Sequence, residues 1–173
     1  MLFQSDSILG AVKRVFRAGG SSHYSVLGPE RPEFDPRHWP KVGVGVLVVR
    51  GQKVLLGKRR GSHGEGEYSS PGGHMEYMES FEQCAHREVH EEAGIEVCNI
   101  RLLRVSNSLQ YLPKHYVDIE VAADWVKGEA RVLEPDRIEH WDWFDIDNLP
   151  QPLFSSIATS VQAYRSGHIV WDP

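Results

Sequence analysis

Three glutamates that lie close together in the sequence, Glu88, Glu91 and Glu92, could act on a ligand as a group. On an α-helix they fall within a sector of about 100°, beside an apolar stripe. Like charges three or four residues apart destabilise a helix by a few tenths of a kcal/mol per pair, so stability alone does not favour this cluster. A hard divalent cation such as Mg²⁺ would offset the repulsion between the glutamates, because it binds carboxylate oxygens and bridges them to substrate phosphates. The cluster therefore predicts metal-assisted phosphate chemistry, and the alternative is a solvated acidic face.

The negative charge of the chain is concentrated around this cluster. The 173 residues include 19 Lys and Arg against 24 Asp and Glu, which gives a net charge of −5. Between Glu65 and Glu96 there are nine acids and one base, Arg87, so this window carries −8 and the rest of the chain +3. Such a chain lacks the broad basic face with which proteins displace counterions from duplex nucleic acid. A nucleic-acid polymer is therefore not an expected partner.

Local signals place the three glutamates on a helix. Ser80 and Gln83 have capping-box spacing and Gly94 supplies a left-handed C-cap, which predicts a helix over 81–93. Prolines precede a second expected helix over 153–165, and a glycine-rich loop is expected over 61–66. Runs of β-prone residues predict strands, of which the first two should form a tight hairpin, at 42–50, 53–60, 95–105, 116–126 and 141–144.

Residues 73–95 read GHMEYMESFEQCAHREVHEEAGI, which resembles the Nudix box, G-x5-E-x7-R-E-U-x-E-E-x-G-U with U aliphatic. Every defined position is filled, by Gly73, Glu79, Arg87, Glu88, Val89, Glu91, Glu92, Gly94 and Ile95. Further segments resemble the Nudix subgroup that contains human thiopurine-nucleotide diphosphatase and plant relatives of the MutT type: PKVGVGVLVV, VLLGKRRGS, PGGHMEY and HWDWFDIDNLPQPLF. The resemblance covers residues 40–157 and implies an α/β fold, the Nudix α/β/α sandwich with a mixed β-sheet.

The resemblance implies a hydrolase of a nucleoside diphosphate linked to another group. Its typical reaction would convert a (d)NTP to a (d)NMP and pyrophosphate, in nucleotide pool sanitation or catabolism. The implied cofactor is Mg²⁺, with Mn²⁺ as the alternative ion. Its implied ligands are Glu88, Glu91, Glu92 and a backbone carbonyl of Gly72 or Gly73.

The resemblance also implies roles in catalysis for residues of the box. Either Glu88 or Glu91 would orient or deprotonate the attacking water, and the choice between them stays open. Arg87 would form an ion pair with Glu79 that locks the preceding loop against the helix. Further acids, which could add a metal ligand or only solvate their loop, are Glu134, Asp136 and Glu139.

Candidate substrate contacts lie outside the acidic helix. Arg59, in the basic run 58–60 at the end of an expected strand, matches a phosphate-contacting position of the subgroup. His74, directly after two glycines, could donate to a phosphate or a sugar, although a lone His is more often structural. Trp141 and Trp143 alternate along an expected strand, which favours core packing over base stacking.

The expected base pocket departs from the subgroup. Ser70 stands where the subgroup has an apolar residue, Asp118 where it has Thr, and Ser155 where it has Trp. Asp118 could accept hydrogen bonds from an exocyclic amine, which predicts a nucleoside triphosphate whose base carries an amino group. Phe154 matches a pocket position and is the aromatic candidate for stacking.

The composition divides the chain into two parts. Residues 1–40 are expected to form a short amphipathic helix and an extended connector, and residues 41–173 the Nudix domain. The basic first segment also resembles an organelle transit peptide, without an evident cleavage signal. No apolar run of about 18 residues is present, which argues against a membrane partner. Two cysteines without zinc-ligand spacing favour the reducing cytoplasm.

The same residues also fit other functions. A pterin triphosphate hydrolase or a dinucleoside polyphosphate hydrolase would need the same metal chemistry. A non-catalytic domain that senses nucleotides is the alternative outside enzymes, although such domains usually lose one of the glutamates and here all are present. The family resemblance also implies a small-molecule nucleotide substrate and a homodimer.

Overall fold

The computed structural model of the chain describes residues 39–61, 64–109 and 114–172, so the helix and connector predicted for 1–40 lie almost entirely outside it. The elements follow in the order β1 (Lys41–Arg50), β2 (Lys53–Arg59), β3 (Tyr68–Ser69), β4 (Gly72–His74), α2 (Phe81–Ala93), β5 (Glu96–Ser108), β6 (Tyr116–Lys127), β7 (Ile138–Asp145), α3 (Ile157–Ser166) and β8 (Val170–Asp172). In the described part of the chain, neither helix is long and apolar enough to cross a membrane.

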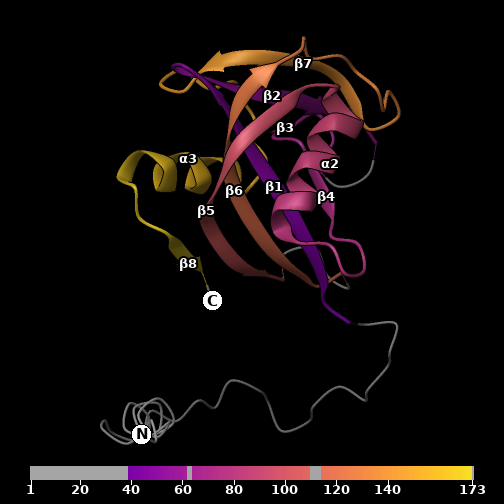
Figure 1. Ribbon diagram of the computed structural model, residues 1–173, viewed down its shortest axis with the longest axis vertical. Coiled ribbons are helices and arrows are strands. Elements are labelled where there is room, and N and C mark those ends of the chain that lie inside the picture. The colour runs from indigo at the N-terminus through magenta and orange to yellow at the C-terminus, as the bar shows by residue number, and fades with distance from the viewer. Residues whose placement is uncertain (1–38, 62–63, 110–113, 173) are drawn as a thin grey trace, which may run out of the picture. The chain divides into compact units, whose positions relative to one another are not determined.

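The strands form a mixed sheet around β1 (Figure 1). Its order is β3-β2-β1-β6-β5-β8, while β4 pairs with β1 and β7 pairs with β2. β1 and β6 run parallel, and β6 pairs antiparallel with β5. The neighbouring strands β1 and β6 are thus far apart in the sequence. Their pairing places the polar residues of β6 beside β1.

The hairpin predicted between β1 and β2 is present only at its turn. Two residue pairs, Val49 with Val54 and Arg50 with Lys53, join the strands there. β2 then leaves to pair with β7 and β3, whereas the first half of β1 pairs with β4. This separation places the glycines of β4 beside β1, directly ahead of the acidic helix.

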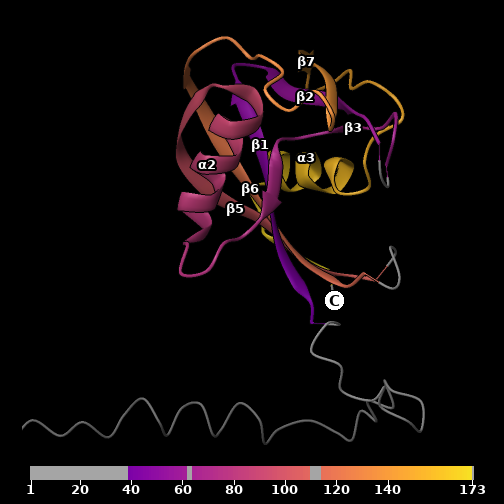
Figure 2. The ribbon, with the colours of Figure 1, turned by 90° about the vertical axis from the view of Figure 1, so that its right-hand side faces the viewer.

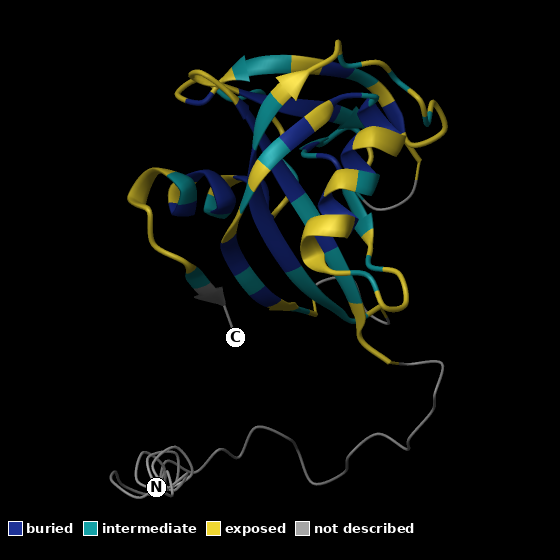
Figure 3. Cartoon of the chain, in the orientation of Figure 1, coloured by how far each residue is buried: buried dark blue, intermediate teal, exposed yellow. Residues whose placement is uncertain are grey.

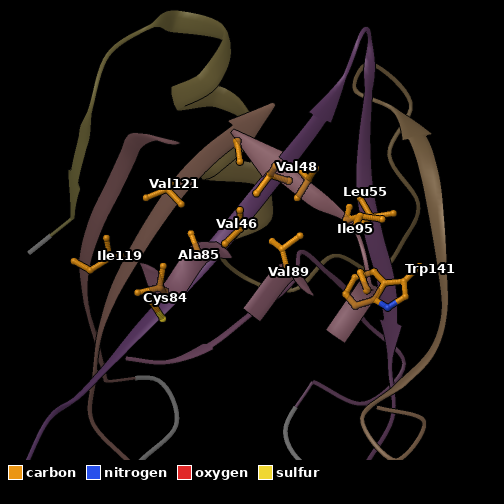
Figure 4. Packing of buried hydrophobic residues seen from close by; sticks show 14 of the residues in the cluster. Val46, Val48, Leu55, Cys84, Ala85, Val89, Ile95, Ile119, Val121 and Trp141 are labelled. Carbon is orange, nitrogen blue, oxygen red and sulfur yellow. The ribbon is translucent and has the colours of Figure 1, made fainter. Parts of the chain in front are cut away.

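The two helices cover opposite faces of the sheet (Figure 2). Successive residues of a strand point to opposite faces, so β1 contributes side chains to the hydrophobic core on each face of the sheet. On one face Val46 and Val48 pack with Val89 of α2 (Figure 4). On the other face Leu47 packs with Ile157 of α3. The predicted α/β/α sandwich with a mixed sheet is confirmed.

Helix α2 has the predicted bounds and caps. Gln83 N donates to Ser80 Oγ at 3.1 Å, and Ser80 N donates to Gln83 Oε1 at 2.8 Å, which forms the capping box. Gly94 ends the helix at φ 68°, a left-handed conformation that glycine adopts without strain. Figure 3 shows the side of α2 that faces the sheet as buried and the outer side as exposed.

The last helix begins four residues later than predicted, at Ile157 rather than at 153. The intervening chain lies beside β3 instead: Tyr68 N donates to Pro152 O at 2.8 Å, and Phe154 N donates to Tyr68 O at 2.9 Å. Because the Pro152 carbonyl and the Phe154 N–H are bound to Tyr68, residues 152–154 do not form the first turn of the helix. The short strands β3, β4 and β8 were not predicted, because two or three residues carry no alternation pattern.

Candidate active site

The three glutamates of the predicted metal cluster differ in exposure. Glu88 and Glu92 are each 6% exposed, whereas the Glu91 side chain is 52% exposed. Burial raises the pKa of Glu92 to about 8 and also raises the pKa of Glu88. Burial disfavours the charged form of a carboxyl group unless a nearby positive charge compensates it. The site therefore favours the approach of a cation.

The glycines of β4 let the carboxylates approach the backbone. Gly72 N donates to Glu92 Oε2 at 3.1 Å. A Cβ atom on Gly73 would lie 2.4 Å from Glu88 Oε1, so any larger residue at this position would displace the Glu88 carboxylate. The first glycine of the box is thus explained by close packing of the Glu88 carboxylate of α2 against β4.

Arg87 ties the acidic side chains together. Its Nε and Nη2 donate to the two oxygens of Glu79 at 2.8 and 2.9 Å, so the expected ion pair is present and bidentate. Its Nη1 donates to Glu88 Oε1 at 2.7 Å and to Glu91 Oε2 at 3.2 Å. The hydrogen bond from Arg87 lowers the pKa of Glu79 to about 2. Arg87 also donates to His74 O at 3.1 Å, which fixes the loop between β4 and α2.

The oxygen donors suit a hard divalent ion, although they are not gathered around one point. In residues 39–61, 64–109 and 114–172, no three His, Cys, Asp or Glu side chains lie together in the arrangement of a metal site. Arg87 Nη1 lies between Glu88 and Glu91 and supplies the positive charge there. Because Glu91 is half exposed, it can change rotamer at small cost. The carboxylate set fits Mg²⁺ or Mn²⁺, which prefer oxygen ligands.

Of the three loop acids named as further ligands, Glu134 is the one whose charge reaches the cluster. Burial is the largest cause of the raised pKa of both Glu88 and Glu92, and the negative charge of Glu134 is a further cause that raises both. Glu139 instead pairs with Lys58 at 3.3 Å. Trp141 belongs to the core, as favoured, and its Nε1 donates to Glu92 O at 3.1 Å, which anchors the end of α2.

Two residues that were predicted to contact the substrate, Arg59 and Phe154, contact each other. The Arg59 guanidinium lies over the Phe154 ring at 4.7 Å, and Arg59 Nη1 donates to Ser69 Oγ at 3.4 Å. Its basic neighbour Arg60 donates to Pro135 O at 3.1 Å. A phosphate-contacting candidate and an aromatic candidate thus form one unit at the ends of β2 and β3.

The other predicted contacts lie along β1 and β4. The His74 ring stacks on Tyr116 with 5.7 Å between the ring centroids, and burial lowers its pKa. Asp118 lies beside Gly43 of β1, and burial raises its pKa. Ser70 is half-buried between β3 and β4. Asp118 and His74 thus flank the same residue of β1, while Ser70 approaches from the other end of β4.

Sequence reasoning missed a set of buried polar residues on the face covered by α3: Arg104, Ser106 and Glu120. Glu120 pairs across strands with Arg104, and Ser106 with Asp118. The signal in the sequence is the recurrence of polar residues at alternate positions within two β-prone runs, which places them on one face.

The raised pKa of Glu120 predicts that the unfolding free energy of the chain depends on pH. Burial raises its pKa to about 7, above the 4.5 of an ordinary glutamate. Its stabilising contribution is therefore fully present below pH 4.5 and is lost as the pH rises through about 7. Relative to Glu120→Gln, the wild-type chain should lose about 3 kcal/mol of unfolding free energy over this range. Urea denaturation at pH 5, 6, 7 and 8 measures it, and parallel curves for the two chains would show that Glu120 does not titrate there.

Comparison with known proteins assigns the chain to a family. The family model described as NUDIX domain matches residues 39–164. The NAD-capped RNA hydrolase NudC of Pseudomonas aeruginosa PAO1 is 41% identical over 114 residues, which are 65% of this chain and 39% of that protein. NudC of Vibrio vulnificus is 35% identical over 139 residues, or 78% of this chain and 51% of the relative. The chain spans about half the length, or less, of these curated relatives.

Solved structures agree with this placement. The crystal structure of a MutT NUDIX hydrolase from Burkholderia pseudomallei has a TM-score of 0.68 and 36% identity, and covers 72% of this chain and 98% of its own. The NUDIX domain of Shewanella oneidensis NrtR, solved with ADP ribose, has a TM-score of 0.65, covers 78% of this chain and 94% of its own, and at 20% identity shows the fold alone. By its matched domain, its filled box and its fold, the chain belongs to the Nudix hydrolase family.

Proposed function

We propose that this Nudix domain hydrolyses a phosphoanhydride bond in a nucleoside diphosphate linked to another group, with Mg²⁺ as cofactor. The first candidate substrate is a nucleoside triphosphate, which would give the monophosphate and pyrophosphate. The observation that carries the proposal is the pair of buried glutamates, Glu88 and Glu92, held against the glycines of β4 with raised pKa values. Buried carboxyls of this kind are costly for a fold and are useful to a cation site.

The protein groups divide the work of the reaction. Glu88, Glu91, Glu92 and the carbonyl of Gly73 would hold Mg²⁺, which when bound would neutralise phosphate oxygens and acidify the attacking water. Glu88 or Glu91 would accept the proton of that water. Arg87 can release Glu91 to the ion and keep both hydrogen bonds to Glu79, so the loop stays in place.

The substrate would lie across the ends of the strands near the cluster. Arg59 would contact the phosphates, and its stacking partner Phe154 would face the base. His74 would donate to a phosphate or sugar, with Ser70 and Asp118 facing the base. Asp118 would accept from an exocyclic amine. The segments that resemble the thiopurine-nucleotide diphosphatase subgroup support a triphosphate.

A second candidate is a dinucleotide such as NAD. The identity of 41% to a protein named NAD-capped RNA hydrolase favours it. NAD is also a nucleoside diphosphate linked to another group, so the same metal chemistry would apply. The relatives' name adds the capped end of an RNA, whereas the charge pattern predicts a free nucleotide. The cytoplasmic location and the homodimer stay predictions from the sequence.

A substrate panel separates these candidates. The full chain is incubated with the common triphosphates, NAD, NAD-capped RNA, a pterin triphosphate and a dinucleoside polyphosphate, each with Mg²⁺ and with a chelator, and the products are separated by chromatography. The expected result is cleavage only with the metal, fastest for a triphosphate with an amino-bearing base. A clear preference for dUTP or dTTP contradicts the role of Asp118, and nucleotide binding without cleavage of any compound supports the sensing alternative.

A further inference from the structure

Glu92 is held in place both at its side chain and at its backbone. Gly72 N donates to Glu92 Oε2 at 3.1 Å, which fixes the carboxylate against β4. At its backbone, Glu92 O accepts hydrogen bonds from Trp141 Nε1 at 3.1 Å and from Leu133 N at 3.2 Å. The last four carbonyls of a helix have no partner within the helix, so Glu92 O needs such donors. The position of this proposed metal ligand therefore depends on residues outside α2.

Trp141 reaches Glu92 from β7 and packs against β2. It pairs across strands with Gly57, where a Cβ atom would lie 2.6 Å from Cε3 and Cζ3 of the indole. The glycine thus leaves the space that the ring occupies. Trp141 is buried in one core cluster with Leu55 and Val89 (Figure 4), so the close packing around the ring limits how far its N–H can turn away from Glu92.

The indole links two parts of the proposed site. β2 carries Arg59, the candidate phosphate contact, two residues beyond Gly57. α2 carries the three glutamates, with Glu92 in its last turn. Because Trp141 packs on β2 and donates to α2, it couples the strand that carries the phosphate contact to the helix that carries the metal ligands.

Core packing alone explains the ring of Trp141 but not the target of its N–H. Trp125 gives a comparison within the chain, because it packs against the same core cluster and its Nε1 donates to Gly128 O at 3.0 Å, in the loop after β6. Trp141 donates instead to the backbone of a proposed metal ligand. Groups that orient the ligands of a metal typically change metal affinity or activity by 10- to 100-fold when they are removed.

We propose that Trp141 is a positioning residue of the metal site, whose indole N–H fixes the backbone of Glu92 so that the carboxylate points at the ion. The inference rests on the proposed function and adds a residue outside the Nudix box to the groups on which turnover depends. In this role Trp141 touches neither the ion nor the substrate. It should therefore affect metal affinity and kcat, and leave the KM for the nucleotide unchanged.

The test removes the N–H and keeps an aromatic ring. We expect Trp141→Phe to weaken Mn²⁺ affinity by about tenfold and to lower kcat at saturating Mg²⁺ by about tenfold, with KM within about twofold of wild type. Trp125→Phe is the matched control, because it also removes an indole hydrogen bond from a ring on the same core cluster. Its Mn²⁺ affinity and kcat should stay within about twofold of wild type. All chains are compared well below their thermal midpoints, so that unfolding does not contribute.

A double variant separates the positioning of Glu92 from a general loosening of α2. If Trp141 acts through the Glu92 carboxylate, Trp141→Phe should change Mn²⁺ affinity by less than about twofold once Glu92→Gln is already present. A loosened helix would instead weaken binding through Glu88 and Glu91 as well, so the two effects would add.

Hydrogen exchange at Gly72 gives a readout without metal or substrate. Gly72 N donates to Glu92 Oε2, so this amide should exchange faster in Trp141→Phe than in wild type. It should exchange at the wild-type rate in Trp125→Phe.

Equal Mn²⁺ affinity and kcat in wild type and Trp141→Phe would overturn the proposal. Additive losses in the double variant, or an equal loss in Trp125→Phe, would overturn it as well. Absence of Mn²⁺ binding by wild type would instead contradict the proposed metal site, and the exchange rate at Gly72 would then decide whether Trp141 positions Glu92.

Discussion

Glu91→Gln and Glu92→Gln are each expected to lower Mg²⁺-dependent product release by about 100-fold or more, because each would remove an anionic ligand oxygen from the proposed Mg²⁺, which would stabilise charge in the transition state. At pH 8 Glu92→Gln should not lower the thermal midpoint. The amide oxygen can still accept the hydrogen bond from Gly72 N, and the pKa of about 8 shows that the fold already disfavours the charged form of Glu92. The measurement is release of phosphate products by wild type and both variants, with and without Mg²⁺.

A control from the same helix separates the site from general charge effects. Glu82 lies in the first turn of α2, and its side chain is 70% exposed and 4.0 Å from His86. Glu82→Gln removes one negative charge from the helix at a distance from the cluster, and activity should stay within about twofold of wild type, as is usual for surface changes. Equal release by wild type, Glu91→Gln and Glu92→Gln would refute the metal assignment.

Arg87→Ala is expected to reduce stability and turnover together. It leaves Glu79 and Glu88, whose side chains are 10% and 7% exposed, without their counter-charge. Loss of one partner from such a network costs roughly 3 kcal/mol of unfolding free energy. The pKa of Glu79, held at about 2 by Arg87, means that this stabilisation is present above pH 4.5 and is lost as the pH falls toward 2. Urea denaturation and steady-state kinetics measure the two effects.

Arg87→Lys provides the matched comparison. A lysine keeps the charge but loses the planar fork that binds both oxygens of Glu79, so it should fall between wild type and Arg87→Ala in stability. If Arg87→Ala raised only KM, with the unfolding free energy and kcat unchanged, Arg87 would be a substrate contact and its structural role would be wrong.

The acidic helix was predictable to the residue because local chemistry sets its ends. The capping box joins Ser80 and Gln83, which are three positions apart, and the left-handed Gly94 ends the helix by its own backbone conformation. Such signals depend on near neighbours in the chain and are read directly from the sequence. The Arg87–Glu79 pair was likewise expected, from the family motif, and the structure contains it.

Long-range packing could not be predicted in the same way. The start of α3 depends on hydrogen bonds between residues 152–154 and Tyr68. The end of α2 is tied by Trp141 to Glu92 across 49 residues of chain. The pairing of Ser106 with Asp118, which brings two polar side chains together across the strands, depends on the register of β5 and on its bulges. No local pattern encodes these contacts, since each depends on where distant strands meet.

Binding of Mn²⁺, followed by the loss of its free electron paramagnetic resonance signal, tests the central claim that the three glutamates form a divalent-cation site. The wild-type chain should bind Mn²⁺, Mg²⁺ should displace it, and Glu92→Gln should weaken the affinity by about tenfold or more while Glu82→Gln leaves it unchanged. Equal Mn²⁺ affinity in wild type and Glu92→Gln would contradict the account, because the cluster would then be only an acidic helix face.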